Sequence, residues 1–385
     1  MKNIAIVAVA YNRCDSLQRL LASLERAYYD ALATLIISVD KSNSDKVELF
    51  ADEYQWPHGD KIVDKHEKNL GLRSHMMSLG KWFNQFDAII VLEDDIVVSP
   101  NFYAYSQHAV EKYYDCEDVA GISLYSMAVN FHTLLPFAPY KDEHDVYFIQ
   151  LAASWGEIWM RNSWKKFNEW YLSHQDFPIT IPHLPKSICS WSSKSWLKYH
   201  DRYCIEENKY FVHPYVSLST NYGDVGEHAT NYSKTYYQVI LQNGVKKDFN
   251  FPVFGSNAVY YDGFFENKAI YSWLGIKEEE LCLDLQGEWH NRLNKKYWLT
   301  TEVADYEIIR SFGLNYRPIE SNIALNDEGC SIYLYDTHKV KEITKHVSNE
   351  VFLYHFRLRN MATFIKSYGL KNTIRDLLKK LKLKR

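Results

Sequence analysis

Short apolar runs separated by helical segments constrain the fold of this 385-residue chain more than any other feature. Ile4–Ala10 is wholly apolar, and residues 88–92 form a second such run. A strand that is apolar on both faces belongs in a sheet covered by helices on both sides. Strands that alternate with helices predict an α/β fold with a parallel sheet. The first hundred residues are expected to hold strands at 4–10, 35–39, 61–63 and 88–92, and helices from Asp15 or Ser16, at 46–54 and from Arg73 to near Phe83.

The length of the chain predicts more than one compact region. A single hydrophobic core seldom organises this many residues. The pattern changes near residue 250 to irregular aromatic segments, followed by a strand-like stretch at 331–335. We therefore expect a first domain at 1–250 and an accessory region at 251–385.

Charge and cysteine content exclude several classes of protein. The net charge of −4 shows no basic excess, which argues against a nucleic-acid-binding protein. The six cysteines are scattered and form no zinc-binding pattern or disulfide framework. The first strand begins at once, without the apolar region of a signal peptide. A reduced, cytoplasmic compartment is the expected location.

The C-terminal tail is basic and amphipathic. The tail has an isoleucine at 374 and leucines at 377, 378, 381 and 383, interspersed with lysines up to Arg385. This spacing predicts a helix. Such a helix suits an anionic membrane surface, or equally the docking of a protein partner. No run of about twenty apolar residues is present, so we expect peripheral contact at the inner membrane face and not a membrane span.

Three acidic residues, Glu93, Asp94 and Asp95, follow the buried strand at 88–92 directly. Ligands of open α/β sheets bind at the carboxyl ends of the strands. Adjacent carboxylates repel one another, and a divalent cation relieves that repulsion. Mg²⁺ and Mn²⁺ prefer oxygen ligands and usually bind one or two carboxylates together with substrate phosphates. The triplet therefore indicates a metal and nucleotide site, although a solvated acidic turn would have the same sequence.

Residues 91–102 resemble the metal-binding strand and turn of GT-A glycosyltransferases, namely the N-acetylglucosaminyltransferase I type and its bacterial surface-polysaccharide relatives. The resemblance implies a GT-A fold, which is a Rossmann-like mixed sheet flanked by helices, here with a C-terminal extension. It also implies that Asp95 is the direct ligand of Mn²⁺ or Mg²⁺. Glu93 and Asp94 would then hold the ribose or the donor sugar.

Further segments match the same family in order, over roughly residues 1–240. The implied contacts of the nucleotide sugar are Tyr11, Arg13, Asp40, Asn69, Gly71, Arg73, Trp155 and Gly156. Residues 223–228 resemble a loop that closes over the donor, which would make His228 a second metal or diphosphate contact. Structural alternatives stay open: Asp40 as a loop cap, Arg73 as a surface charge, Trp155 as a core aromatic and His228 as an ordinary loop residue.

The general base is the weakest part of the resemblance. Relatives carry an aspartate in a W-D-x-x-W-like segment, whereas residues 191–196 read W-S-S-K-S-W. A transfer with inversion needs a carboxylate within hydrogen-bonding reach of the acceptor hydroxyl. The candidates are Asp201, Glu157 and Glu227.

The resulting hypothesis is a hexosyl- or N-acetylhexosaminyltransferase of capsule or lipopolysaccharide synthesis. It would move a sugar from a nucleotide sugar, with a UDP-sugar expected, to a hydroxyl of a glycan or lipid-linked glycan. The resemblance implies inversion. The alternatives are a catalytically silent carbohydrate-binding or scaffold protein of the same fold and a nucleotidyltransferase. The latter usually has a glycine-rich loop after the first strand, where this chain has Tyr11, Asn12 and Arg13.

Overall fold

The computed structural model describes residues 2–224, 237–287 and 294–342, together with 354–355, 365–366, 369–370 and 374. The chain forms two compact units. The first contains Met1–Asp224 and Lys234–Ala269, and the second contains Ile270–Gly287 and most of the later residues. Residues 251–269 thus belong with the first unit, whereas the sequence pattern placed the boundary near residue 250.

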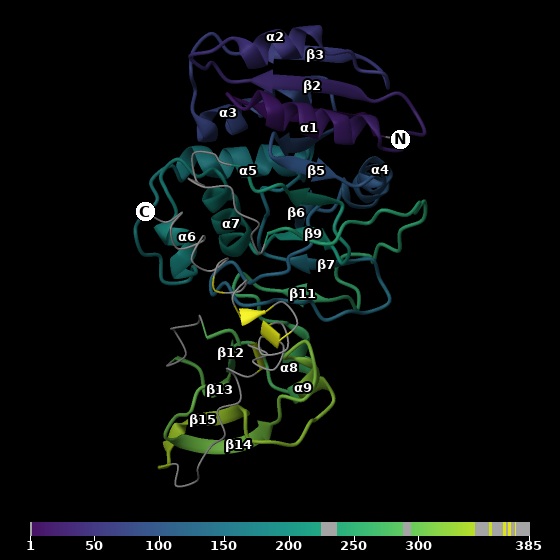
Figure 1. The fold of residues 1–385 in the computed structure, drawn as a ribbon. Coiled ribbons are helices and arrows are strands. Elements are labelled where there is room, and N and C mark those ends of the chain that lie inside the picture. Colours follow the sequence, from purple (N-terminus) through teal and green to yellow (C-terminus); the bar gives the residue numbers. More distant parts are fainter. Residues whose placement is uncertain are drawn as a thin grey trace. The chain divides into compact units, whose positions relative to one another are not determined.

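A nine-stranded sheet forms the centre of the first unit. Its strands are β1 (Ile4–Ala10), β2 (Thr34–Val39), β3 (Lys61–Lys65), β4 (Ala88–Glu93), β6 (Val119–Ser123), β7 (Val146–Ile149), β8 (Glu157–Met160), β9 (Tyr210–Pro214) and β11 (Tyr260–Tyr261). They lie in the order β11-β7-β9-β6-β8-β4-β1-β2-β3 (Figure 1). The pairs β4–β8, β6–β8 and β7–β9 are antiparallel, and the other pairs are parallel. The predicted mixed α/β sheet is confirmed.

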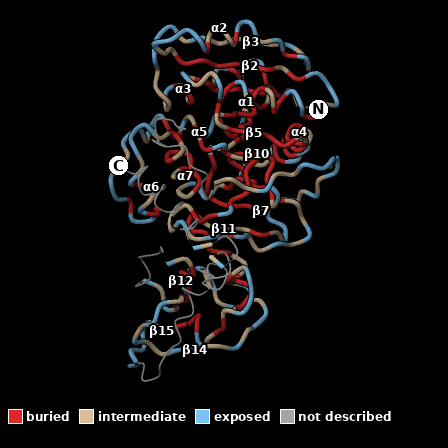
Figure 2. The backbone as a smooth tube through the Cα atoms, in the orientation of Figure 1, coloured by how far each residue is buried: buried red, intermediate tan, exposed pale blue. Residues whose placement is uncertain are grey.

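Helices cover both faces of this sheet because its strands are apolar on both sides. Alternate residues of β1 enter two different cores, Ile4, Ile6 and Ala8 on one face and Ala5, Val7 and Val9 on the other. The first core includes residues of α1 (Cys14–Glu25), α2 (Lys46–Glu53) and α4 (Phe102–Tyr113). The second includes residues of α3 (Leu72–Ser78), α5 (Arg161–Ser173) and α7 (Leu197–Glu206). The central strands are accordingly buried along their length (Figure 2).

The expected elements of the first hundred residues are present with shifted ends. The first helix begins at Cys14, one residue before the expected cap. The helix expected from Arg73 to Phe83 is divided into α3 and the 3₁₀ helix η1 (Leu79–Asn84). A further short helix, α6 (Lys186–Ser190), precedes α7.

The second unit has its own sheet and core. Strands β12 (Leu281–Asp284), β13 (Tyr297–Thr300), β14 (Tyr306–Phe312) and β15 (Ile332–Val340) lie in the order β12-β13-β15-β14. Helices α8 (Ala269–Leu274) and α9 (Ser321–Ala324) contribute to its apolar cluster. Most of the basic tail lies outside the described residues. Among the described residues, no helix combines the length and apolar character needed to cross a bilayer.

Candidate functional site

The acidic triplet lies at the carboxyl end of β4, beside the end of β1. The two strands run parallel, with Glu93 opposite Val9. Asp94 and Asp95 form the turn into the short strand β5 (Ile96–Val98). Arg13, just after β1, forms an ion pair with Asp94, and its Nη1 lies 3.5 Å from Asp95 Oδ2. The sheet therefore brings Arg13 to the triplet, as the sequence predicted for residues of one site.

Electrostatics show that one arginine does not balance this site. The pKa of Glu93 is raised to about 8, mainly by burial and also by the charges of Asp95 and Asp94, while Arg13 and a hydrogen bond from Trp196 oppose the shift. Burial likewise raises the pKa of Asp94 to about 6 against the charge of Arg13. For Arg13, burial alone would lower the pKa, but the two aspartates outweigh it and the pKa is raised. Three carboxyl groups facing one guanidinium favour a second cation.

Asp95 is the carboxylate best placed to bind that cation. Its side chain is 19 % exposed, against 5 % for Asp94. Arg13 approaches only Oδ2 of Asp95, and no described residue bonds Oδ1. A hard divalent cation prefers such an oxygen and completes its shell with water and substrate phosphates. The residues present thus fit a Mg²⁺ or Mn²⁺ ion held by Asp95.

A second strand pair, formed by β5 and β10 (Ser219–Asn221), lies next to the triplet. Strand β10 pairs antiparallel with β5, and the Tyr222 amide donates to the Asp95 carbonyl at 2.8 Å. The carboxylate of Asp224 then accepts a hydrogen bond from Ser16 at 2.7 Å and pairs with Arg19. The charge of Arg19 also lowers the pKa of Asp94.

Arg19, Asp224 and Trp196 were not predicted as site residues. The loop at residues 223–228 was the only signal for Asp224, because the contact of Asp224 with Arg19 of α1 joins residues 205 positions apart. Glu227 and His228 lie outside the described residues, so the structure leaves their predicted roles untested.

Asp40 follows β2 and holds a neighbouring turn. Its buried carboxylate accepts three backbone hydrogen bonds, from Lys41 at 3.0 Å, Leu70 at 2.8 Å and Gly71 at 3.0 Å. Asn69 donates to the Lys41 carbonyl at 3.0 Å. Gly71 has a φ of 74°, which favours glycine. These contacts support the structural interpretation of Asp40 as a loop cap.

Replacing Asp40 with alanine is expected to lower the stability by about 3 kcal/mol, because the amides would lose their shared acceptor inside the protein. Asp40→Asn keeps one acceptor oxygen and should lose about half as much. Urea unfolding monitored by tryptophan fluorescence measures both variants. An Asp40→Ala protein as stable as the wild type would show that the carboxylate does not hold the turn.

Trp155 and Gly156 lie in an aromatic cluster. The partly buried Trp155 ring packs 4.6 Å from Tyr237 and 4.8 Å from Tyr125, measured between centroids. Gly156 has a φ of 103°, and a Cβ atom there would approach Leu124 at 3.2 Å. The glycine therefore permits a close approach of backbone to core.

Two of the three candidate general bases are inside the protein. Glu157 and Asp201 are each 1 % exposed. Glu157 accepts a hydrogen bond from Trp159 Nε1 at 2.6 Å, and Asp201 accepts one from the Ala152 amide at 2.8 Å. Burial raises both pKa values well above the usual range, which disfavours the charged form that a general base needs. This argues against either residue as the base, because β8 is an interior strand and α7 turns Asp201 inward.

His200 lies beside Glu157 in the same interior. Its Nδ1 is 3.7 Å from Glu157 Oε2, and its ring stacks on Phe167 with centroids 4.1 Å apart. Burial lowers the pKa of His200 to about 3, so the ring is neutral at physiological pH, and burial disfavours the charged form of Glu157 as well.

A His200→Phe variant is expected to lose part of the acid sensitivity of the fold. The unfolded histidine binds a proton below about pH 6.5, whereas the buried one does so only near pH 3, so this residue costs stability as the pH falls between those values. The variant should gain about 2 kcal/mol more over the wild type at pH 5 than at pH 8. Urea midpoints at both pH values test this, and an equal difference at both would contradict it.

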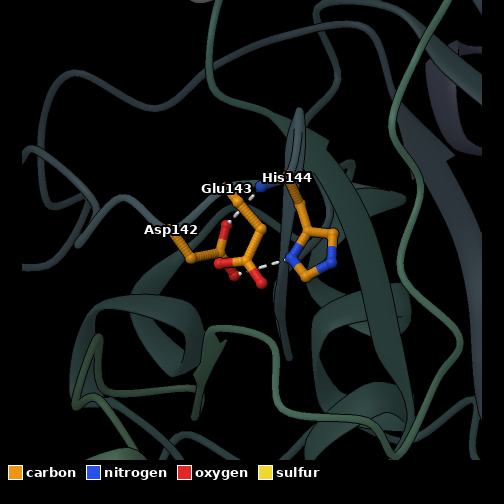
Figure 3. Close-up of side chains that lie close together, drawn as sticks. All are labelled: Asp142, Glu143 and His144. Carbon is orange, nitrogen blue, oxygen red and sulfur yellow. Dashed lines mark hydrogen bonds and ion pairs between the residues drawn. The ribbon is translucent and has the colours of Figure 1, made fainter.

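A group of potential metal ligands lies elsewhere in the first unit. Asp142, Glu143 and His144 bring three ligand atoms within 4.8 Å of one another in the loop before β7 (Figure 3). His144 Nδ1 contacts Asp142 Oδ2 at 2.9 Å, and the His144 amide donates to Oδ1 at 2.9 Å. These bonds account for the cluster as a local turn.

Comparisons with known proteins concern the fold alone. No family model matches the chain, and no curated protein matches it. Among solved structures, S. aureus TarS 1–349 in complex with UDP-GlcNAc is similar at 14 % identity and a TM-score of 0.41, over 60 % of this chain and 62 % of that one.

Two further structures are similar at the same level. GalNAc-T7 with UDP, GalNAc and Mn²⁺ matches at 17 % identity and a TM-score of 0.39, over 57 % of this chain and 43 % of that one. The mannosyltransferase PcManGT from Pyrobaculum calidifontis, in complex with GDP-Man and Mn²⁺, matches at 10 % identity and a TM-score of 0.32. The match covers 49 % of this chain and 50 % of that one. Each match covers less than two thirds of the solved chain. These matches support the fold, and any function has to be inferred from the acidic triplet and the residues around it.

Proposed function

We propose that this chain is a glycosyltransferase that binds a nucleotide sugar at the carboxyl ends of β1 and β4, with a divalent cation on Asp95. The observation that carries the proposal is the excess of carboxylates at the turn after β4, where Asp95 keeps one oxygen unbonded by any described residue. When bound, the cation supplies positive charge to the nucleotide diphosphate as it leaves.

The residues of the chain have separate roles in this proposal. Asp95 holds the cation, while Arg13 neutralises Asp94 and fixes the turn. Arg19 and Asp224 fasten the residues after β10 beside the triplet. Glu227, which lies outside the described residues, remains a candidate for the general base. The UDP-sugar donor, the glycan or lipid-linked glycan acceptor, inversion, and contact of the basic tail with a membrane are proposals from the sequence.

A thermal-shift series tests donor binding. UDP-, GDP-, CMP- and dTDP-sugars are added with and without Mn²⁺ to the wild type, to Asp95→Asn and to the control Asp115→Asn, which removes an exposed carboxylate. One nucleotide class should raise Tm only with the metal, in the wild type and the control but not in Asp95→Asn. If no nucleotide shifts the wild type, the proposal fails.

The burial of Glu157 and Asp201 favours one alternative, a silent protein that binds nucleotide sugars without turnover. Release of free nucleotide from the bound donor, with or without an acceptor, distinguishes the two functions. An active transferase releases the nucleotide slowly even to water, whereas a silent protein does not.

A further inference from the structure

Two cations of the first unit gather on an aromatic surface beside the proposed donor site. We define the Arg73–Lys198 cluster as Arg73, Phe177, Lys198 and Tyr199. Arg73 donates to the Tyr199 hydroxyl at 2.7 Å. The Lys198 ammonium lies 4.4 Å from the centroid of Phe177 and 5.5 Å from that of Tyr199. The start of α3 and the first turn of α7 thus hold two positive charges close together.

Neither charge has an acidic partner among the described residues. Lys198 is only 4 % exposed, and the hydrogen bond of its ammonium to a described residue is a 3.4 Å contact with the Trp191 carbonyl. Its own burial and the charge of Arg73 lower the pKa of Lys198. Arg202, on the same helix, has Glu206 at 2.8 Å. A buried ammonium without a counter-ion is costly, and contacts with rings offset only part of that cost.

The cluster is close to the triplet but separate from it. Trp196, which bonds Glu93, precedes Lys198 by two residues. Arg13 forms the ion pair with Asp94, whereas Arg73 donates to the Tyr199 hydroxyl and the Lys198 ammonium contacts the Trp191 carbonyl. An anion at the cluster would therefore be a different group from the diphosphate beside Asp95.

We propose that Arg73 and Lys198 bind an anionic group, a phosphate or a carboxylate, carried by the acceptor or by the transferred sugar. Arg73 is partly exposed, so an anion can reach it from solvent. The buried ammonium of Lys198 then neutralises the remaining charge of the anion. Charge-assisted hydrogen bonds from both residues make such contacts strong. The class of ligand rests on the proposed function, whereas the anion site itself does not.

Inorganic phosphate, without nucleotide, is the first probe. Calorimetric titration at constant ionic strength compares the wild type with Lys198→Met, Lys198→Arg and the control Lys165→Met, which removes an exposed lysine. The wild type, Lys198→Arg and the control should bind phosphate, and Lys198→Met should bind it about tenfold more weakly or not at all. The Tm of Lys198→Met should equal or exceed that of the wild type, because the variant no longer buries an unpaired charge.

Two pairs of ligands then identify the source of the anion. UDP-glucuronate is compared with UDP-glucose in the presence of Mn²⁺, and a hexose 6-phosphate is compared with the free hexose. Tighter binding of UDP-glucuronate than of UDP-glucose assigns the anionic group to the transferred sugar. Tighter binding of the hexose 6-phosphate than of the free hexose assigns it to the acceptor. In either case Lys198→Met should remove the preference and leave binding of UDP with Mn²⁺ unchanged.

Two results would overturn the proposal: no phosphate binding by the wild type, or equal binding by Lys198→Met. Failure of the proposed function has a different signature, since UDP with Mn²⁺ would then not bind the wild type while phosphate still could. A marked loss of stability in Lys198→Met without phosphate binding by the wild type would assign the lysine a structural role.

Discussion

Asp95→Asn is expected to lower metal-dependent release of nucleotide from the donor sugar by about 10³-fold. The amide keeps the size of the side chain but removes the charge that would hold the proposed cation, and with it the positive charge that this cation would supply to the leaving diphosphate. Steady-state assay of free nucleotide at saturating Mn²⁺ measures the effect. The loss should appear in kcat, because charge develops on the diphosphate in the transition state.

The control for this variant is Asp115→Asn, which should retain wild-type rates because Asp115 is exposed and remote from the triplet in sequence. The fold of Asp95→Asn should be intact, since the partner of Arg13 at closest range is Asp94. If the rate of Asp95→Asn were within about threefold of the wild-type rate, a cation bound to Asp95 would not be needed for the reaction.

Trp159→Ala is expected to cost about 4 kcal/mol of stability, the largest loss predicted for one residue. Trp159 is 1 % exposed and stacks on Trp164 with centroids 4.4 Å apart. Its Nε1 donates to the buried carboxyl group of Glu157 at 2.6 Å. Alanine would leave a cavity between β8 and α5 and remove that hydrogen bond.

The matched variant Trp159→Phe separates these two causes. It keeps a ring in the cavity and loses the donor, so its cost should be about 1–2 kcal/mol. Urea unfolding gives both values. Equal costs for alanine and phenylalanine would mean that the hydrogen bond to Glu157, and not the packing, stabilises this core.

The core of the first unit was predictable from local sequence because its strands are apolar on both faces. Residues 4–10 and 88–92 could be assigned as buried strands, and the leucines of α1 as one helical face, from nearest neighbours alone. The sheet order was less accessible. The insertion of antiparallel β8 between β4 and β6 depends on pairing of residues about seventy positions apart.

The same distinction between local sequence signals and long-range contacts applies to the residues of the site. Glu93, Asp94 and Asp95 could be singled out because they follow a recognisable strand, whereas Arg13 was implied only by the family resemblance of the turn after the first strand. The inward orientation of Glu157 and Asp201 could not be read from sequence, since a carboxyl group in a core is unusual and depends on its hydrogen-bond donor. Arg19 and Asp224 were missed because only the pairing of β5 with β10 brings them together.

The most direct test of the central claim is anomalous diffraction from a crystal grown with Mn²⁺ and the nucleotide selected by thermal shift. We expect a manganese peak in contact with the carboxylate of Asp95 and the phosphates of the nucleotide. A peak only at Asp142, Glu143 and His144, or a nucleotide bound away from the turn after β4, would contradict it.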